Sequence, residues 1–210
     1  MAMGVIFMRR ADFGISPITA VPAAVTDAAA YRGFTLPGIG ITLGNTTIVL
    51  HALCVIGQIL LVRRVTLKSL LTMLVGIPFG KIIDLFNLLV GLHVETVVMR
   101  LLVLLIGLCL SGLGVLVVVG SDLMLPAPDE LSHTISQLYD KKLSNVKIIS
   151  DAIYVLFAIA IDLIFTGRLS TVGIGTVLSV LLVGRFVGWF GKLLPWVRME
   201  PFWTLPKKEN

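Results

Sequence analysis

VVMRLLVLLIGLCLSGLGVLVVVG, residues 97–120, is the stretch that decides the fold, because Arg100 is its only charged residue. At a rise of about 1.5 Å per residue, one helix of this length crosses a hydrocarbon core of about 30 Å. Similar apolar runs lie at 39–62, 67–91, 147–166 and 172–194, the last one interrupted by Arg185. Strands would leave backbone groups unpaired in lipid, and the alternation typical of a β-barrel is absent. We therefore expect an all-α fold, a polytopic membrane helix bundle.

The composition supports a membrane protein. The 210 residues are 57% hydrophobic and 14% charged, with a mean hydropathy of +1.00. Soluble domains have about a quarter charged residues. The net charge of +5 does not indicate nucleic-acid binding, because Lys and Arg lie in short clusters between the apolar runs, as in membrane proteins. An ordinary cytosolic domain, a disordered chain and a nucleic-acid-binding module are therefore excluded.

The chain matches itself when it is shifted by about 110 residues, which indicates an internal repeat. Each half then contains a spanning helix, a short helix that is polar or proline-rich, and two further spanning helices. Small loop insertions separate the matching blocks. The matched positions are Gly4-Val5 with Gly114-Val115, Ala11-Asp12 with Ser121-Asp122, Gln58 with Asp162, Arg64 with Arg168, and Gly76-x-x-x-Gly80 with Gly184-x-x-x-Gly188.

The repeat divides the chain into a first half, a second half and a polar tail. These parts are 1–93, 94–196 and 197–210, with the short helices expected at 14–31 and 128–141 and with 97–120 as the first span of the second half. In the first half, only the last third of the matching helix is present, from Met1 to Arg10. We expect that the chain starts late, by roughly half to two-thirds of a helix. The alternative is a short natural segment at the membrane interface.

The basic residues predict how the halves are oriented. With three crossings in each half, the halves are inverted and most basic residues share one face. That face would carry Arg63, Arg64, Lys68, Lys141, Lys142, Lys147, Arg198, Lys207 and Lys208, and the other face Arg9, Arg10, Arg32 and Arg168. Four crossings would divide these charges nearly evenly and would place the polar segment 128–141 in lipid. We therefore expect inverted repeats with both termini on the cytoplasmic side.

Three short motifs carry a family resemblance. They are Ala11-Asp12-Phe13-Gly14-Ile15-Ser16-Pro17, then Gly76-Ile77-Pro78-Phe79 with Asp84, and Val172-Gly173-Ile174-Gly175-Thr176 followed by Gly184. They resemble the ADLGxSP, GPxxDxx and GxGT…G elements of the YczE/YyaS/YitT group of bacterial membrane proteins. The second half departs from the group, because 122–128 lacks an expected Gly and Arg185 replaces the usual Pro. The resemblance implies a multi-pass protein of the bacterial inner membrane and supplies no catalytic residues.

Polar residues in or beside the apolar runs are candidates for function, because placing an ionisable group in a bilayer costs about 2.5–3.5 kcal/mol on insertion scales. The candidates for a solute pathway are Asp12, Asp122, Asp129, Asp151, Asp162, Arg185 and Gln58. Three simpler interpretations stay open: Arg185 snorkels to the interface, Asp151 only starts its helix, and the match of Gln58 with Asp162 is chance.

Other residues are expected to have structural roles. Lys81 and Asp84 lie three residues apart on one helical face and are expected to form an ion pair, with a pathway role as the alternative. Helix packing is expected to use Gly76, Gly80, Gly184 and Gly188. No Cys or His spacing predicts a metal site, and no cofactor is expected.

Short or broken helices at matching positions of two repeats are typical of secondary transporters. We therefore expect a small secondary transporter in the lipid bilayer, with a site for a small polar or ionic solute between the repeats. The alternative for the short helices is that both lie flat on the membrane as amphipathic linkers. The alternative for the function is a non-transporting membrane regulator or scaffold for a partner protein, and a homo-oligomer is compatible with either. An enzyme is not expected, because no Ser/His pair, paired catalytic Asp or metal set lies at usable spacing.

Overall fold

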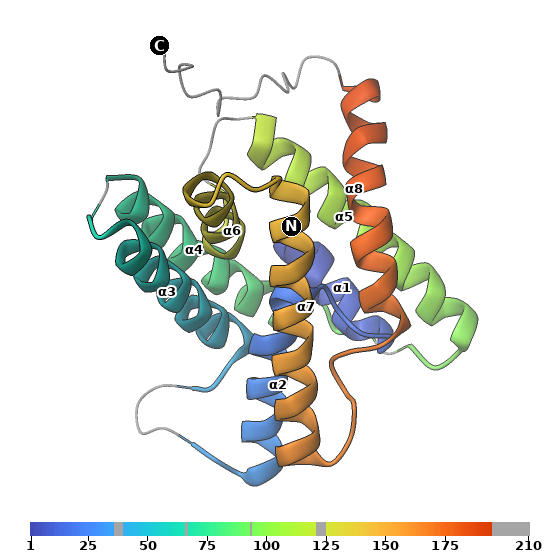
Figure 1. The fold of residues 1–210 in the computed structure, drawn as a ribbon. Coiled ribbons are helices and arrows are strands. Elements are labelled where there is room, and N and C mark those ends of the chain that lie inside the picture. Colours follow the sequence, from blue (N-terminus) through green and yellow to red (C-terminus); the bar gives the residue numbers. More distant parts are fainter. Residues whose placement is uncertain (36–39, 66, 93, 121–124, 195–210) are drawn as a thin grey trace, which may run out of the picture.

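The computed structural model describes residues 1–35, 40–65, 67–92, 94–120 and 125–194. Over these residues the chain is helical and contains no strand, which confirms the all-α polytopic bundle (Figure 1). The elements are α1 (Ala2–Ala11), α2 (Pro17–Arg32), α3 (Leu43–Val62), α4 (Leu67–Leu89), α5 (Val97–Gly120), α6 (Ala127–Leu138), α7 (Leu143–Ile161), the π-helix η1 (Asp162–Thr166) and α8 (Ile174–Leu193). Asp122 and the tail 197–210 lie outside the described residues.

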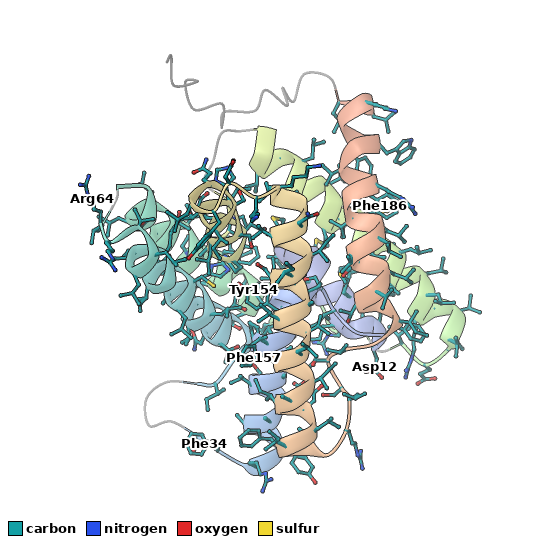
Figure 2. All side chains as sticks on the ribbon, viewed as in Figure 1. Asp12, Phe34, Arg64, Tyr154, Phe157 and Phe186 are labelled. Atoms are coloured by element: carbon teal, nitrogen blue, oxygen red, sulfur yellow. The ribbon has the colours of Figure 1, made fainter. Side chains whose placement is uncertain are left out.

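Five helical segments are long and apolar enough to cross a membrane. They are Leu43–Val62, Ser69–Leu89, Val97–Val118, Asn145–Thr166 and Ile174–Leu193. Their outer faces carry uncovered apolar side chains: Leu88 on α4 is 83% exposed, and Phe157 on α7 is 59% exposed (Figure 2). Lipid tolerates such a surface, whereas water disfavours it. These helices indicate a membrane protein, in which α1, α2 and α6 are too short to cross alone.

Local sequence explains where several helices begin and end. Pro17 occupies the first position of α2, where its fixed φ suits a helix. α3 begins at Leu43, later than its apolar run, because the Thr42 hydroxyl accepts a hydrogen bond from the Asn45 N–H at 3.2 Å and caps the helix. Gly33, with φ 64°, ends α2 in the left-handed conformation. The helices are therefore shorter than the apolar runs where a cap or a proline fixes their start.

The short helix α1 packs between α5 and α4 and crosses α5 at very close range. A Cβ atom on Gly4 would overlap the backbone of Ser111, and a Cβ atom on Gly114 would overlap the backbone of Met1. Small residues are therefore required at both points. The predicted repeat register matches Gly4 with Gly114 and Met1 with Ser111. The Gly4–Ser111 and Met1–Gly114 contacts are therefore the pair that a two-fold relation between the halves would interchange.

Each short helix contacts a spanning helix of the other half. α2 lies beside α7 (Figure 1). Arg32 at the end of α2 donates a hydrogen bond to the Phe165 carbonyl at 3.1 Å. α6 packs against both α3 and α7. The two halves of the sequence are therefore interleaved rather than stacked as separate bundles.

The two GxxxG motifs differ in their surroundings. Gly76 on α4 contacts the His51 ring on α3, and Gly80 contacts the α3 backbone. Among the described residues, no atom beyond the adjoining backbone of α8 lies within 4 Å of a Cβ position on Gly184 or Gly188. The α4 pair therefore packs against α3 as expected of all four glycines, whereas the α8 pair makes no such contact with the described residues. α8 instead packs on α5 with another face.

The asymmetry predicts different effects of the same substitution in the two motifs. Gly80→Ala should lower the free energy of unfolding by about 1–3 kcal/mol, because the added methyl would meet the Gly44 carbonyl oxygen and the Ile48 side chain at 2.5 Å. Gly188→Ala is the matched control and should not destabilise, since its methyl enters open space and alanine favours a helix. Thermal unfolding of both variants in detergent checks this. Equal losses of stability would contradict the described packing.

Candidate functional site

The segment between α1 and α2 is held against the second half of the chain by backbone hydrogen bonds. The Ile15 N–H donates to the Thr171 carbonyl at 3.1 Å, and the Gly175 N–H donates to the Phe13 carbonyl at 2.6 Å. Gly14 has φ 96°, and a Cβ atom there would overlap the Gly173 backbone. Only glycine adopts this conformation and allows this approach without strain. Two motifs that lie far apart in the sequence, at 11–17 and 172–176, therefore meet in space.

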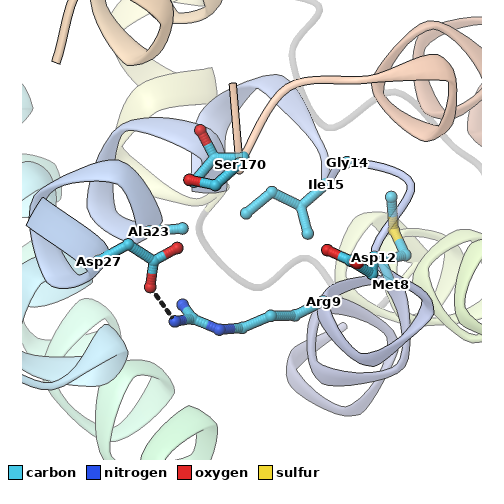
Figure 3. Close-up of a pocket in the computed structure, with 9 residues that line it drawn as sticks. Met8, Arg9, Asp12, Gly14, Ile15, Ala23, Asp27 and Ser170 are labelled. Atoms are coloured by element: carbon cyan, nitrogen blue, oxygen red, sulfur yellow. Dashed lines mark hydrogen bonds and ion pairs between the residues drawn. The ribbon is translucent and has the colours of Figure 1, made fainter. Parts of the chain in front are cut away.

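A pocket lies beside this contact, between the two halves (Figure 3). Its lining includes Arg9 and Asp27 from the first half and Ser170 and Thr171 from the second half. Arg9 Nη2 forms an ion pair with Asp27 Oδ1, and the two side chains are 27% and 32% exposed. The pair is therefore partly withdrawn from solvent but still reachable from the pocket.

The electrostatics of the pocket centre on Asp27, which lies on α2 outside the spanning helices. Burial raises the pKa of Asp27 above its ordinary value, and the adjacent Arg9 guanidinium opposes this rise by charge and hydrogen bonding. The carboxylates of Asp162 and Asp12 raise the pKa further. Arg9 is thus the cation in a region where several carboxylates repel one another.

Asp162 holds in place the loop that forms one wall of the pocket. Its side chain is fully buried at the start of η1 and accepts four hydrogen bonds: from the Ser170 N–H at 2.9 Å and hydroxyl at 3.1 Å, and from the Thr171 N–H at 2.9 Å and hydroxyl at 2.8 Å. A buried carboxylate is stable only when hydrogen bonds such as these replace its contacts with water. Asp162 therefore fixes the loop that forms the pocket wall, and the described lining does not include it.

A second polar cluster lies between α3, α6 and α7. Lys147 Nζ lies 2.6 Å from Asp129 Oδ1 and 2.8 Å from Asp151 Oδ1, so it joins two of the predicted candidates. Gln58 Nε2 donates to Thr134 Oγ1 at 2.8 Å and so links α3 to α6. The sequence alignment of the two halves matches Gln58 with Asp162, but the two side chains make different contacts: Gln58 bonds to the short helix α6, and Asp162 bonds to the loop before α8.

Of the other predicted candidates, Asp12 lines the pocket and Arg185 lies apart from both clusters. Asp12 is exposed and pairs with Arg100, with 3.2 Å between Asp12 Oδ2 and Arg100 Nη1. Arg185 is exposed on α8, and within the described part of the chain its side chain has no hydrogen-bond or ion-pair partner. The position of Asp122 is not among those described.

Lys81 and Asp84 are bonded to α3 rather than to each other, contrary to the ion pair expected from their spacing. Lys81 Nζ donates to Asn45 Oδ1 at 2.8 Å. Asp84 accepts hydrogen bonds from the Thr42 hydroxyl and from the Gly44 N–H, both at 2.7 Å. Because a carboxylate near the N-terminus of a helix satisfies free N–H groups, the start of α3 is the better partner for Asp84.

Sequence reasoning missed three charged residues of these clusters, namely Arg9, Asp27 and Lys147. Asp27 could have been found, since it is the only acidic residue in the apolar helix PITAVPAAVTDAAAYR. Its pairing with Arg9 has no sequence signal, because the two residues lie on different helices. Over the described residues, no group of three His, Cys, Asp or Glu side chains is placed to hold a metal ion.

The raised pKa of Asp27 predicts how pH acts on stability. A carboxyl group whose pKa is higher in the folded than in the unfolded state gains a proton on folding, so its contribution to stability falls as pH rises through the folded pKa. The melting temperature of the wild type relative to Asp27→Asn should therefore rise as pH is lowered from 7 towards 4. Thermal unfolding across this range checks the sign. A relative stability that instead falls with decreasing pH would show that the ion pair with Arg9 outweighs burial.

Comparison with known proteins gives a family but no activity. No curated protein and no solved structure matches the chain. One family, described as “Family of unknown function (DUF6198)”, matches residues 1–192 and so spans every described helix except the last residue of α8. The chain therefore belongs to the DUF6198 family of unknown function.

Proposed function

We propose that this protein is a small secondary transporter that moves a small polar or ionic solute through a site between two inverted repeats. The observation that carries the proposal is the pocket in which Arg9 and Asp27 of the first half face Ser170 and Thr171 of the second. Sites of secondary transporters are typically built where two repeats meet and where helices are interrupted. The α1–α2 break and the start of α8 supply such interruptions here.

The directions of the helices support inversion of the halves. In Figure 1, α3 runs towards the upper end of the bundle and α7 runs away from it, while α4 descends and α8 ascends. Helices at matching repeat positions thus run in opposite directions. The exchange of the Gly4–Ser111 and Gly114–Met1 contacts between the halves supports the same relation.

In this conformation the pocket has room for about one water molecule, so a solute could bind only after it opens. The groups that line it suit a solute that carries charge or several hydrogen-bonding groups. A partly buried ion pair can release either member to a solute, so Arg9 would bind a carboxylate or phosphate and Asp27 would bind an ammonium group. Ser170 and Thr171 add hydroxyl groups, although Asp162 already accepts a hydrogen bond from each. Recognition rather than bond cleavage is the proposed role, and no catalytic step is part of it.

The distribution of basic residues supports one orientation in the membrane. Arg64 lies at the end of the bundle where α3 ends (Figure 2), and Lys142 immediately precedes α7, which starts at the same end. We place this end on the cytoplasmic side by the positive-inside rule. The membrane would be the bacterial inner membrane, as the resemblance to the YczE/YyaS/YitT group implies.

Solute flux in proteoliposomes tests the proposal. Wild-type protein should exchange at least one member of a panel of labelled amino acids, organic anions, amines and inorganic ions. Asp27→Asn and Arg9→Gln should each lower this flux by about tenfold or more, equivalent to about 1.4 kcal/mol, because each removes one member of the pocket's ion pair. Lys81→Gln is the control, since it removes an exposed cation that bonds to Asn45 outside the pocket lining.

Two outcomes would count against transport. Wild-type protein that moves no member of the panel, yet co-purifies with a fixed protein partner, would favour the membrane regulator or scaffold instead. Equal flux in the wild type and in folded Asp27→Asn and Arg9→Gln variants would show that the solute does not use this pocket.

A further inference from the structure

The two halves contain the same helix pair in different arrangements. In the first half, α4 packs on α3 through Gly76 and Gly80, with a Cβ on Gly76 only 2.7 Å from His51 Nδ1. In the second half, the matching residues Gly184 and Gly188 face open space. Over the described residues, α8 packs on α5 and marginally on α2, and α7 is not among its substantial partners. If the two halves are repeats, the contact formed between α3 and α4 is therefore missing between the matching helices α7 and α8 over the described residues.

The face of α7 that would complete the missing contact is also uncovered. In the first half, Gly80 contacts Ile48 on α3. The register that matches Gln58 with Asp162 matches Ile48 with Ala152 on α7, and Ala152 is exposed. Ile148, one turn earlier on the same face, is 63% exposed. The surface of α7 that matches α3 and the surface of α8 that matches α4 are thus both uncovered among the described residues.

Exposed glycines in the middle of α8 need an explanation. A glycine in an exposed helix costs about 1 kcal/mol relative to alanine, and α8 has one at each of two positions a turn apart. Packing against another helix is what small residues at this spacing provide in membranes. The first half shows which helix fills the matching face: the neighbouring helix of the same half.

We propose that α8 closes onto α7 through Gly184 and Gly188 in a second conformation of this protein, in which α4 moves away from α3. The closing partner is α7 of the same chain. The exchange rests on the proposed transport function, for which it supplies the alternating access: one pair of helices is apart on one side of the pocket while the other pair is together. Closure also moves Arg185, which has no partner in the described residues, towards the helix that carries Asp151.

Disulfide crosslinking tests the closure. The variant carries Ala152→Cys and Gly188→Cys in a background with Cys54→Ala and Cys109→Ala, and it is oxidised with copper phenanthroline in proteoliposomes. The control carries Phe157→Cys and Gly188→Cys, because Phe157 is also exposed on α7 but about 140° around the helix from Ala152. We expect an intramolecular disulfide at least tenfold faster in the first variant, identified by mass spectrometry of the linked peptides.

Three results would overturn the closure. One is crosslinking no faster than in the control while both cysteines still react with a small thiol reagent. Another is a disulfide-linked dimer, which would show that a second copy covers this face. The third comes from Gly80→Leu, which should weaken the α3–α4 contact and favour the state in which α4 is apart from α3. If the Gly80→Leu protein is as stable as the wild type and its 152–188 crosslink forms no faster, the closure is wrong.

Flux through the same proteoliposomes separates the closure from transport itself. If the wild type moves a solute, formation of the 152–188 disulfide should stop flux by more than tenfold, and reduction should restore it. If the disulfide forms but the wild type moves no solute, closure stands and the transport function fails. If the wild type transports and no disulfide forms, transport stands and the closure is wrong.

Discussion

The structure depends on hydrogen bonds between two non-helical stretches of backbone, the segment between α1 and α2 and the segment that leads into α8. Backbone N–H and C=O groups cannot stay unpaired at membrane depth, so every break between helices must find partners within the protein. Here the Phe13 carbonyl and the Ile15 N–H bond to Gly175 and Thr171. The glycines at 14 and 173 let the two strands of backbone approach closely enough. This contact joins the first half of the chain to the second and places the Arg9–Asp27 pair against the loop that contains Ser170.

Polar groups follow the same logic elsewhere in the bundle. Asp162 holds the pocket loop with four hydrogen bonds, and Asp84 holds the start of α3 with two. Lys147 joins α6 to α7 through two carboxylates. In each case a charged side chain fastens a helix end or a short helix to a spanning helix. The pocket differs, because its ion pair is partly exposed and both members line an accessible space.

Sequence could predict the helices but not which side chains meet. The run at 97–120 and its relatives identify spanning helices because length and apolarity are local properties. Lys81 and Asp84 share a helical face, so their spacing favours an ion pair, yet the free N–H groups of α3 offer Asp84 a better partner. Arg9 and Asp27 have no spacing rule to connect them. Helices that are apolar on all sides also hide which face packs, and for this reason the two GxxxG motifs could not be distinguished in advance.

Labelling of single cysteines from each side of the membrane shows whether the two halves that form the pocket have opposite orientations, as proposed. Arg64, Lys142, Arg32 and Arg168 are all exposed, so each can be replaced by cysteine in a cysteine-free background and treated with a membrane-impermeant thiol reagent. With oppositely oriented halves, positions 64 and 142 should react from one side and positions 32 and 168 from the other. Reaction of positions 64 and 142 from opposite sides of the membrane would contradict the proposed orientation.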